Sequence, residues 1–325
     1  MNSNRSGMRA VVFDGKLGFA ADYPIPELPE DWALIRIKKA GICQTDLELM
    51  KGYKSFKGVL GHEFIGIVEK CCALEWIGKR ITGEINVACG KCPLCKKGLG
   101  NHCPDRKVLG IDKLDGCMAD WCVLPVSNLF EIPENITDDR AVFIEPLSAA
   151  CQIIDQVSFR GDEHVIVLGD GRLGILCAWA ISTVVNDVTL FGHHPEKLDI
   201  SKWRHLKSAP GPLKTENEAD IVVDATGSGA GISEAMSICK PGGTIVLKST
   251  VASKADLNLA PIVVKEINLI GSRCGRFEVG IQMLKSYPDM PLERLITENY
   301  PVEEAITAFE RASMVDALKV LIEMA

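Results

Sequence analysis

The stretch that decides the fold of half the chain is Val165-Ile166-Val167-Leu168-Gly169-Asp170-Gly171-Arg172-Leu173-Gly174. Its first four residues are apolar without polar alternation, which predicts a strand buried on both faces. The apolar run from Leu173 to Thr183 predicts a helix that begins directly after the glycines. A G-x-G-x-x-G motif between a buried strand and a helix is typical of a dinucleotide-binding turn.

Each glycine of this motif has a separate physical task. Gly169 permits the tight turn, Gly171 lets backbone amides approach a pyrophosphate, and Gly174 allows the helix to pack closely on the strand. Arg172 and Leu173 lie between the last two glycines and start the helix. We therefore expect all five residues to line a cofactor site.

Outward from this motif, short apolar strands alternate with helical segments. Strands are predicted at 188–191, 221–223 and 244–247. Buried strands separated by helices indicate an α/β fold with a doubly wound parallel sheet. The segment 197–220 contains Pro210, Gly211 and Pro212 and is expected to be irregular. By contrast, the first 150 residues are rich in strands and loops.

The end of the second strand bears on which nucleotide binds. A carboxylate is expected there, about 20 residues after the motif, if the cofactor is NAD, because it would bind the ribose 2′-hydroxyl. Gly192 stands at that place, followed by His193, His194 and Lys197. Without an acid to repel a 2′-phosphate, this pattern slightly favours NADP over NAD.

Composition limits the classes of protein. The chain has 325 residues, 36 lysines and arginines against 43 acidic residues, and a net charge of −7. With no basic run, this composition argues against nucleic acid as the main partner. No stretch of about 18 apolar residues and no secretory leader are present, so we expect a cytoplasmic protein. In that reducing compartment the 13 cysteines indicate metal binding or catalysis rather than disulfides.

Four of these cysteines form the most specific signal in the chain. Cys89, Cys92, Cys95 and Cys103 follow a C-x2-C-x2-C-x7-C spacing, with glycine and proline between them. Four thiolates make a closed tetrahedral zinc site of the structural kind. An iron–sulfur cluster is the competing interpretation, because such clusters also use short C-x2-C steps.

A second constellation lies upstream, in Cys43 and in the neighbours His62 and Glu63. One thiolate, one imidazole and a carboxylate would leave a fourth coordination position for water or substrate, as catalytic zinc sites do. Neither fragment is specific alone, because a single cysteine or histidine is more often a packed side chain.

Together and in this order, the motifs resemble those of the medium-chain dehydrogenase/reductase superfamily, in its zinc-dependent alcohol dehydrogenase branch. The matching segments are Gly41–Asp46, Gly61–Glu63, Cys89–Cys103, Asp115–Trp121 and the glycine-rich turn. The resemblance implies a GroES-like catalytic domain at 1–150 and 291–325, interrupted by a Rossmann domain at 151–290. It also implies hydride transfer between a secondary alcohol or polyol, or its carbonyl, and NAD(P), two zinc ions per chain, and a homodimer or homotetramer.

The resemblance assigns ligands to the catalytic zinc. Cys43 and His62 match the first two. The third is either Glu63 or Glu145, because Glu145-Pro146-Leu147 resembles the polyol and threonine dehydrogenase pattern. Cys151, six residues further on, competes only weakly, since it is expected to pack inside a helix.

Residues around the substrate and cofactor follow from the same resemblance. Thr45 stands where the family places the hydroxyl that takes the alcohol proton, and Asp46 where a carboxylate orients the zinc histidine. Glu48 stands where relatives often have a relay histidine. Late cofactor contacts are expected at Thr226, Arg273 and Lys319.

Two other classes of function stay open at this point. A zinc-ribbon protein could bind nucleic acid through the four-cysteine loop, although the acidic composition argues against it. A catalytically inactive dehydrogenase relative could keep the fold and the structural zinc. Cys43, Thr45, His62 and Glu145 argue against inactivity, whereas Glu48 leaves it some room.

Overall fold

The computed structural model describes residues 7–211, 216, 218–249 and 257–324. The chain divides into two compact units. Unit 1 comprises Met1–Glu145 and Ile296–Ala325, and unit 2 comprises Pro146–Leu295. The division expected from the sequence was 1–150 with 291–325, and 151–290.

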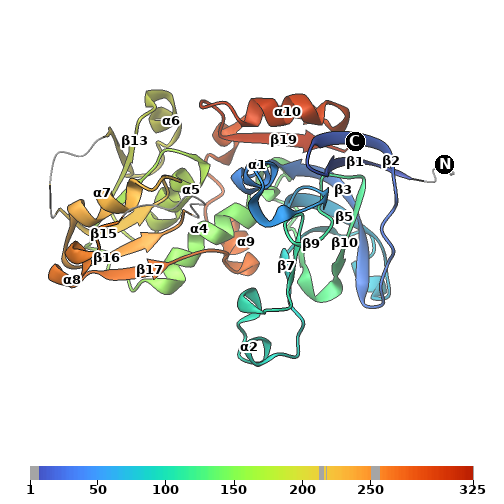
Figure 1. Ribbon diagram of the computed structural model, residues 1–325, viewed down its shortest axis with the longest axis horizontal. Helices are drawn as coiled ribbons and strands as arrows, with labels where there is room; N and C mark the ends of the chain where they lie inside the picture. Colours follow the sequence, from blue (N-terminus) through green and yellow to red (C-terminus); the bar gives the residue numbers. More distant parts are fainter. Residues whose placement is uncertain (1–6, 212–215, 217, 250–256, 325) are drawn as a thin grey trace. The chain divides into compact units, whose positions relative to one another are not determined.

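Unit 2 is built on a six-stranded sheet in which every neighbouring pair is parallel. The strand order is β14-β13-β12-β15-β16-β17, in which the chain starts in the middle and winds outward in both directions (Figure 1). The strands are β12 (His164–Leu168), β13 (Asp187–Gly192), β14 (Lys207–Pro210), β15 (Ala219–Asp224), β16 (Cys239–Leu247) and β17 (Asn268–Gly271). This order is that of the dinucleotide-binding Rossmann fold, so the predicted fold class is confirmed.

Helices of unit 2 pack against this sheet. They are α4 (Ile144–Gln156), whose first two residues belong to unit 1, α5 (Arg172–Ile181), α6 (Pro195–Ile200), α7 (Gly231–Ile238), α8 (Ala260–Val264) and α9 (Phe277–Ser286). Eight of the ten residues of α5 are buried, because it lies between the sheet and its neighbours. The short helix η5 (Leu292–Leu295) ends the unit.

Two elements of unit 2 lie where the sequence predicted irregular structure. The stretch 197–220, expected to be irregular, contains both most of α6 and the edge strand β14. β14 ends at Pro210, whose ring cannot donate a ladder hydrogen bond, and pairs with β13 alone. An edge position tolerates proline, because one side of the strand needs no partner.

The described part of unit 1 forms three sheets, in which most strand pairs are antiparallel and the pairs β8–β9 and β18–β19 are parallel. β2-β1-β4 form one, β11-β6-β5-β3-β19-β18 with β10 on β3 form the largest, and β7-β8-β9 form the third. The strands are β1 (Met8–Phe13), β2 (Leu17–Tyr23), β3 (Trp32–Gly41), β4 (Gly58–Val59), β5 (Glu63–Cys71), β6 (Arg80–Gly83), β7 (Asn86–Val87), β8 (Lys107–Leu109), β9 (Lys113–Leu114), β10 (Trp121–Pro125), β11 (Leu129–Glu131), β18 (Ile296–Pro301) and β19 (Lys319–Glu323).

The helices of unit 1 are short. They are α1 (Gln44–Met50), η1 (Tyr53–Ser55), η2 (Leu74–Trp76), α2 (Pro93–Lys96), η3 (Gly100–His102), η4 (Val126–Asn128), α3 (Asp138–Ala141), η6 (Val302–Glu304) and α10 (Ala305–Ala312). At the start of α3, Asp138 accepts a hydrogen bond of 2.7 Å from Arg80 and another from Lys38. These contacts fasten α3 to the largest sheet.

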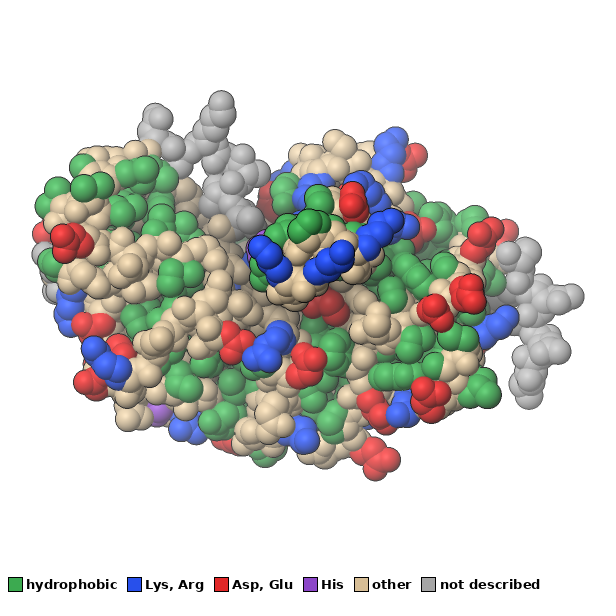
Figure 2. All heavy atoms as spheres, turned by 90° about the horizontal axis from the view of Figure 1, so that it is seen from below, with side chains coloured by type: hydrophobic (Ala, Val, Ile, Leu, Met, Phe, Trp, Pro, Cys, Tyr) green, Lys and Arg blue, Asp and Glu red, His purple; other side chains and the backbone are tan. Residues whose placement is uncertain are grey.

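The loop that carries α2 and η3 projects from the rest of unit 1 (Figure 1). Lysine side chains gather on it in Figure 2, and Lys91, Lys96 and Lys97 are exposed there. The loop has little hydrophobic core of its own, because Cys103 is its one buried residue between 88 and 103. Something other than apolar packing must hold it together.

Among the described residues, no helix reaches the length and apolarity that crossing a bilayer requires.

Candidate active site and metal centres

The four cysteines of the projecting loop converge on one point. Their ligand atoms all lie within 4.8 Å of one another. The Sγ atom of Cys92 is 3.4 Å from that of Cys95 and 3.9 Å from that of Cys103, and Cys89 Sγ is 4.0 Å from Cys95 Sγ. All four are free thiols.

These distances fit a single tetrahedral ion. Zinc–sulfur bonds of about 2.3 Å place neighbouring thiolates about 3.8 Å apart in a tetrahedron. Backbone N–H groups of Lys91 and Cys92 lower the pKa of Cys89 to about 7, so a thiolate is accessible at neutral pH. The donor set therefore suits the structural zinc expected from the sequence.

Cys43, His62 and Glu63 form a second cluster, again with ligand atoms within 4.8 Å of one another. Cys43 caps the start of α1, and Glu63 begins β5. His62 and Glu63 are buried, at 3% and 0% exposure, whereas Cys43 is half-buried. The chain thus brings together three of the four residues expected around the catalytic ion.

Asp46 positions this cluster. Its Oδ2 accepts a 2.8 Å hydrogen bond from the backbone N–H of Cys43, and its Oδ1 accepts one of 3.3 Å from that of Gly61. The same Oδ1 lies 3.4 Å from Nδ1 of His62. One buried carboxylate therefore ties the start of α1 to the loop that carries His62, in the orienting position expected for it.

The electrostatics of the cluster favour a cation. Burial lowers the pKa of His62, but the negative charges of Asp46 and Cys43 outweigh this and raise it well above its usual value. Glu63 Oε1 is buried and has no hydrogen-bond partner among the described residues. An orphaned carboxylate oxygen beside a thiol and an imidazole fits a zinc ion, which is the group the resemblance implies.

Lys319 lies beside this cluster, against Glu63. Its ammonium group pairs with Oε2 of Glu63, and both side chains are 0% exposed. Burial lowers the pKa of Lys319 to about 8, although the charges of Cys43 and Asp46 oppose this, so the group is protonated at neutral pH. The structure thus places the ammonium group of Lys319 on Glu63, and its expected contact with the cofactor stays a prediction. Gly41 leaves the room for this pair, since a Cβ there would lie within 3.0 Å of Glu63.

The remaining residues expected at the reacting centre differ in how close they lie. Thr45 Oγ1 accepts a 3.7 Å hydrogen bond from Cys43 Sγ, so the hydroxyl is beside the donor set. Glu145, in the first turn of α4, is not part of the three-residue cluster. Glu48 contacts Lys51 and Gln44, at 3.0 and 2.9 Å, and these hydrogen bonds lower its pKa. That makes Glu48 a weak proton acceptor.

In unit 2 the glycine-rich turn has the geometry of a dinucleotide site. Gly169 has a φ of +108°, and a Cβ there would meet the backbone of Ala225 within 3.0 Å. A Cβ on Gly174 would likewise collide with the carbonyl of Gly169, whereas one on Gly171 would meet nothing within 4 Å. The turn therefore leaves open space where a pyrophosphate would approach, next to the half-buried Arg172 and Leu173.

The end of β13 holds a contact that the sequence did not predict. A carboxylate does reach Gly192, but it belongs to Asp170 of the glycine-rich turn. Asp170 Oδ2 accepts hydrogen bonds from the backbone N–H groups of His193 and His194, at 2.6 and 2.7 Å. Lys197 is only 6% exposed. The sequence signal for this contact was a glycine at the end of β13 combined with an acid inside the glycine-rich turn.

Two further cofactor candidates lie at or after the ends of strands. Thr226 follows β15, and its hydroxyl donates a 2.8 Å hydrogen bond to Asp224. Arg273 follows β17 and is exposed, and its carbonyl accepts a 2.8 Å hydrogen bond from the buried Lys248. Both belong to the carboxyl edge of the sheet, where open α/β sheets bind ligands.

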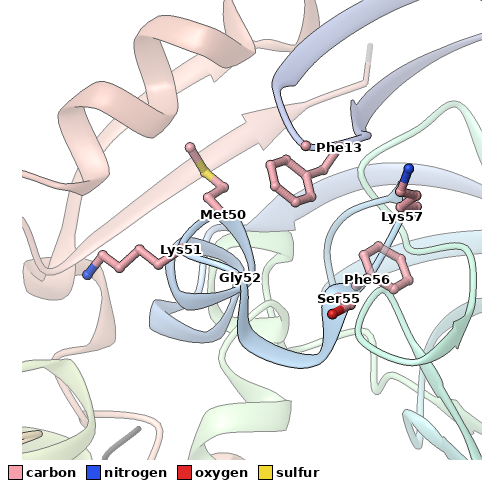
Figure 3. Close-up of a pocket in the computed structure, with 8 residues that line it drawn as sticks. Phe13, Met50, Lys51, Gly52, Ser55, Phe56 and Lys57 are labelled. Carbon is pink, nitrogen blue, oxygen red and sulfur yellow. The ribbon is translucent and has the colours of Figure 1, made fainter. Parts of the chain in front are cut away.

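A hollow of about 360 Å³ lies in unit 1 beside the segment that follows α1. Figure 3 shows its lining residues, with the Lys51 side chain extending away from Phe13 and Phe56. The lining residues are Phe13, Gly15, Met50, Lys51, Gly52, Ser55, Phe56 and Lys57. None of the three clustered ligand candidates lines it, so it is separate from the metal cluster.

Comparison with known families covers nearly the whole chain. Residues 29–134 match the family model of the alcohol dehydrogenase GroES-like domain, and residues 138–324 match that of the glucose dehydrogenase C-terminus. The chain belongs to the zinc-dependent alcohol dehydrogenase branch of the medium-chain dehydrogenase/reductase superfamily. The predicted family is thereby confirmed, and this zinc-dependent dehydrogenase is an NAD(P)-linked oxidoreductase of alcohols or polyols.

Individual relatives agree with this family. A probable D-xylulose reductase A of Aspergillus clavatus is 28% identical, over 93% of this chain and 92% of its own. A short chain alcohol dehydrogenase of Escherichia coli CFT073, solved with NADH, has a TM-score of 0.89 at 24% identity, covering 98% of this chain and all of its own. A putative zinc-binding dehydrogenase of Sinorhizobium meliloti, bound to NADP, has a TM-score of 0.86 at 25% identity, covering 97% and 99%. The comparisons do not favour the nucleic-acid-binding or inactive alternatives for this dehydrogenase.

Proposed function

We propose that this dehydrogenase oxidises a secondary alcohol group of a polyol, or reduces the corresponding carbonyl, at a zinc ion held by Cys43, His62 and a glutamate. The observation that carries the proposal is the cluster of Cys43, His62 and Glu63, with its orphaned carboxylate oxygen and its hydroxyl neighbour Thr45. A thiolate, an imidazole and a carboxylate leave a coordination position for substrate.

Each residue has a distinct role in this proposal. The ion supplies Lewis acidity, which lowers the pKa of an alcohol so that its proton can leave. Thr45 Oγ1 accepts that proton and hands it on, which general acid–base catalysis requires of a group at the reacting atoms. Asp46 fixes His62 and Cys43 through its two carboxylate oxygens. Glu48 is the proposed later acceptor, although its pairing with Lys51 weakens it in that role.

Glu63 and Glu145 share the third ligand position in this proposal. Glu63 Oε1 faces no partner among the described residues, while Lys319 holds its other oxygen. A carboxylate fastened by one oxygen can turn the other toward the ion or leave it. Glu145 would then be the alternate ligand, as the family pattern around it suggests.

We further propose two zinc ions per chain, the second held by Cys89, Cys92, Cys95 and Cys103. Cytoplasmic location is supported by the 13 cysteines, all of them free. Self-association into a homodimer or homotetramer is supported by apolar side chains on unit 2. Val263 and Val264 on α8 are 76% and 82% exposed, and Leu269 on the edge strand β17 is 43% exposed.

The choice of substrate class rests on the segment after α1 and on relatives. Tyr53-Lys54-Ser55-Phe56-Lys57 is more polar than a loop serving a purely aliphatic alcohol would need. The fungal D-xylulose reductases to which the chain is similar act, by their names, on a hydroxylated ketone. Both observations favour a hydroxylated substrate.

The test combines turnover with metal analysis. NAD and NADP reduction are measured with xylitol, sorbitol, 2,3-butanediol and 2-propanol, before and after treatment with a chelator. We expect xylitol or sorbitol to exceed 2-propanol, activity to vanish on chelation and return with zinc, and two zinc ions per chain. Cys43→Ser should abolish turnover and remove one zinc ion.

The matched control is Cys72→Ser, because Cys72 is exposed and belongs to neither cluster. It should keep both zinc ions and full activity. If no alcohol in the panel reduces either nucleotide and fewer than two zinc ions are found, the proposal fails.

The sequence alone slightly favoured NADP, because no carboxylate stands at the end of the second strand. The structure supplies a carboxylate there from another segment, so that argument no longer holds. We therefore propose NAD as the preferred nucleotide, because the carboxylate of Asp170 lies at the end of β13.

A further inference from the structure

We infer that Asp170 sets the nucleotide preference of this dehydrogenase, acting from the glycine-rich turn in place of the strand-end acid that Gly192 replaces. The inference rests on the proposed use of a nicotinamide nucleotide by unit 2. It concerns one internal carboxylate and the two backbone amides to which it is bound.

The carboxylate of Asp170 lies beside Gly192, at the end of β13. A Cβ built on Gly192 would lie within 3.0 Å of the Oδ2, Cβ and Cγ atoms of Asp170, which are its three nearest neighbours. Asp170 therefore fills the volume that the side chain of an acid at position 192 would begin to fill. In NAD-binding Rossmann domains that acid binds the ribose 2′-hydroxyl.

The carboxylate of Asp170 also takes up two backbone donors after β13. Its Oδ2 accepts hydrogen bonds from the backbone N–H groups of His193 and His194, at 2.6 and 2.7 Å. Nδ1 of His194 lies 3.1 Å from both oxygens. Consecutive backbone N–H groups that point to one place bind anions. Here an internal anion already takes both, so a 2′-phosphate would lose these donors.

The carboxyl group of Asp170 is negatively charged at neutral pH. Burial alone would raise the pKa of Asp170, but the backbone N–H and ring of His194 and the N–H of His193 lower it. The side chain is only 9% exposed, which limits screening by solvent. The negative charge is therefore permanent at neutral pH and stands where a 2′-phosphate would have to lie.

The basic residues nearby do not offset the repulsion between Asp170 and a 2′-phosphate. His194 is already engaged with Asp170, and Lys197, which the sequence offered as a phosphate partner, is buried at 6% exposure. His193 is exposed and offers a single imidazole. Gly192 and the turn are also fixed to one another, because Gly169 N–H donates a 2.8 Å hydrogen bond to Phe191.

The test measures equilibrium binding of NADH and NADPH from their fluorescence, without turnover. We expect the wild type to bind NADH about tenfold or more tighter than NADPH, as a like charge at this range implies. Asp170→Asn keeps the shape and removes the charge, so the NADH-to-NADPH affinity ratio should fall about tenfold. Asp162→Asn is the charge-matched control, since Asp162 is exposed and should leave both affinities unchanged.

A transposition of the acid sharpens the test. Asp170→Gly alone should lose the preference for NADH, and Asp170→Gly combined with Gly192→Asp should regain it, because Asp170 is what blocks a side chain at 192. Gly192→Asp alone should bind both nucleotides poorly, since the two carboxylates would collide.

The outcomes separate this inference from the proposed function. If the wild type binds NADPH as tightly as NADH, or tighter, Asp170 does not set the preference, while nicotinamide nucleotide use stands. If neither nucleotide binds at all, the proposed function falls and the inference falls with it. An unchanged affinity ratio in a folded Asp170→Asn also overturns the inference.

Discussion

Replacing Lys319 by methionine removes the ammonium group that pairs with Glu63 inside unit 1. Methionine fills a similar volume, so the change isolates charge from packing. Both side chains are 0% exposed, and Glu63 would be left as a buried carboxylate with an orphaned second oxygen. Asp46 and Cys43 add negative charge on the same side, and His62 already faces these two groups.

The size of the effect follows from this burial. Breaking a buried pair by removing one partner costs about 3–5 kcal/mol, since an uncompensated charge is left behind. At about 2–4 °C per kcal/mol for a unit of this size, the melting temperature should fall by roughly 6–20 °C. Glu63→Gln should lower the free energy of unfolding by less. The ammonium group of Lys319 would still be stabilised by the negative charges of Asp46 and Cys43.

The assay is a double-mutant cycle on the free energy of unfolding, measured by urea denaturation with circular dichroism. The four proteins are the wild type, Lys319→Met, Glu63→Gln and the double variant, all measured with zinc removed by a chelator, because a zinc ion on Glu63 would itself balance the carboxylate charge. The double variant should recover most of the loss seen in Lys319→Met, because two neutral side chains leave no buried charge unpaired.

Lys79→Met is the matched control. Lys79 pairs with Glu131 at 2.6 Å, but the two side chains are 34% and 54% exposed. The same substitution there should cost less than about 1 kcal/mol. A loss below about 1 kcal/mol in Lys319→Met, or a double variant as unstable as that single variant, would refute the reasoning.

Three further predictions follow from other contacts. Cys92→Ser should lower the zinc content from two ions per chain to one by atomic spectroscopy, whereas Cys122→Ser, a buried cysteine outside both clusters, should keep two. Thr45→Val should lower kcat by about 10²–10⁴ with zinc content unchanged, and Thr45→Ser should keep most of the rate, as steady-state kinetics can show. Asp138→Asn should cost about 1–2 kcal/mol at pH 7. Burial would raise the pKa of Asp138, but its lysine and arginine partners lower it, so the difference should vanish as urea denaturation is repeated at pH values falling below about 4.

The features that the sequence predicted well are local ones. The turn at 169–174 and the loop of Cys89–Cys103 each lie within 15 residues, so spacing alone limits the geometry. The Rossmann sheet was predicted because its buried strands are mostly apolar and show no regular polar alternation. β14 was missed because it has no apolar run and ends at Pro210, and an edge strand needs no continuous apolar face.

The features that the sequence did not reveal depend on contacts between distant segments. Glu63 and Lys319 are 256 residues apart, and no local pattern links them. A lysine inside the apolar run Lys319–Ile322 does require a buried partner, but spacing cannot say which one. Asp170 was assigned no role from the sequence, because the strand-end acid was sought only at Gly192.

The pairing of Glu63 with Lys319 also bears on how the protein is made. At about 5–20 residues per second, Lys319 leaves the ribosome roughly 13–50 s after Glu63. All of unit 2 is synthesised in that interval, and β19, which pairs with both β3 and β18, arrives last. Unit 2 can therefore be complete while the largest sheet of unit 1 still lacks a strand and the carboxyl group of Glu63 still lacks its counter-ion. A nascent chain stalled before residue 319 should present a finished nucleotide-binding unit beside an open, protease-sensitive one.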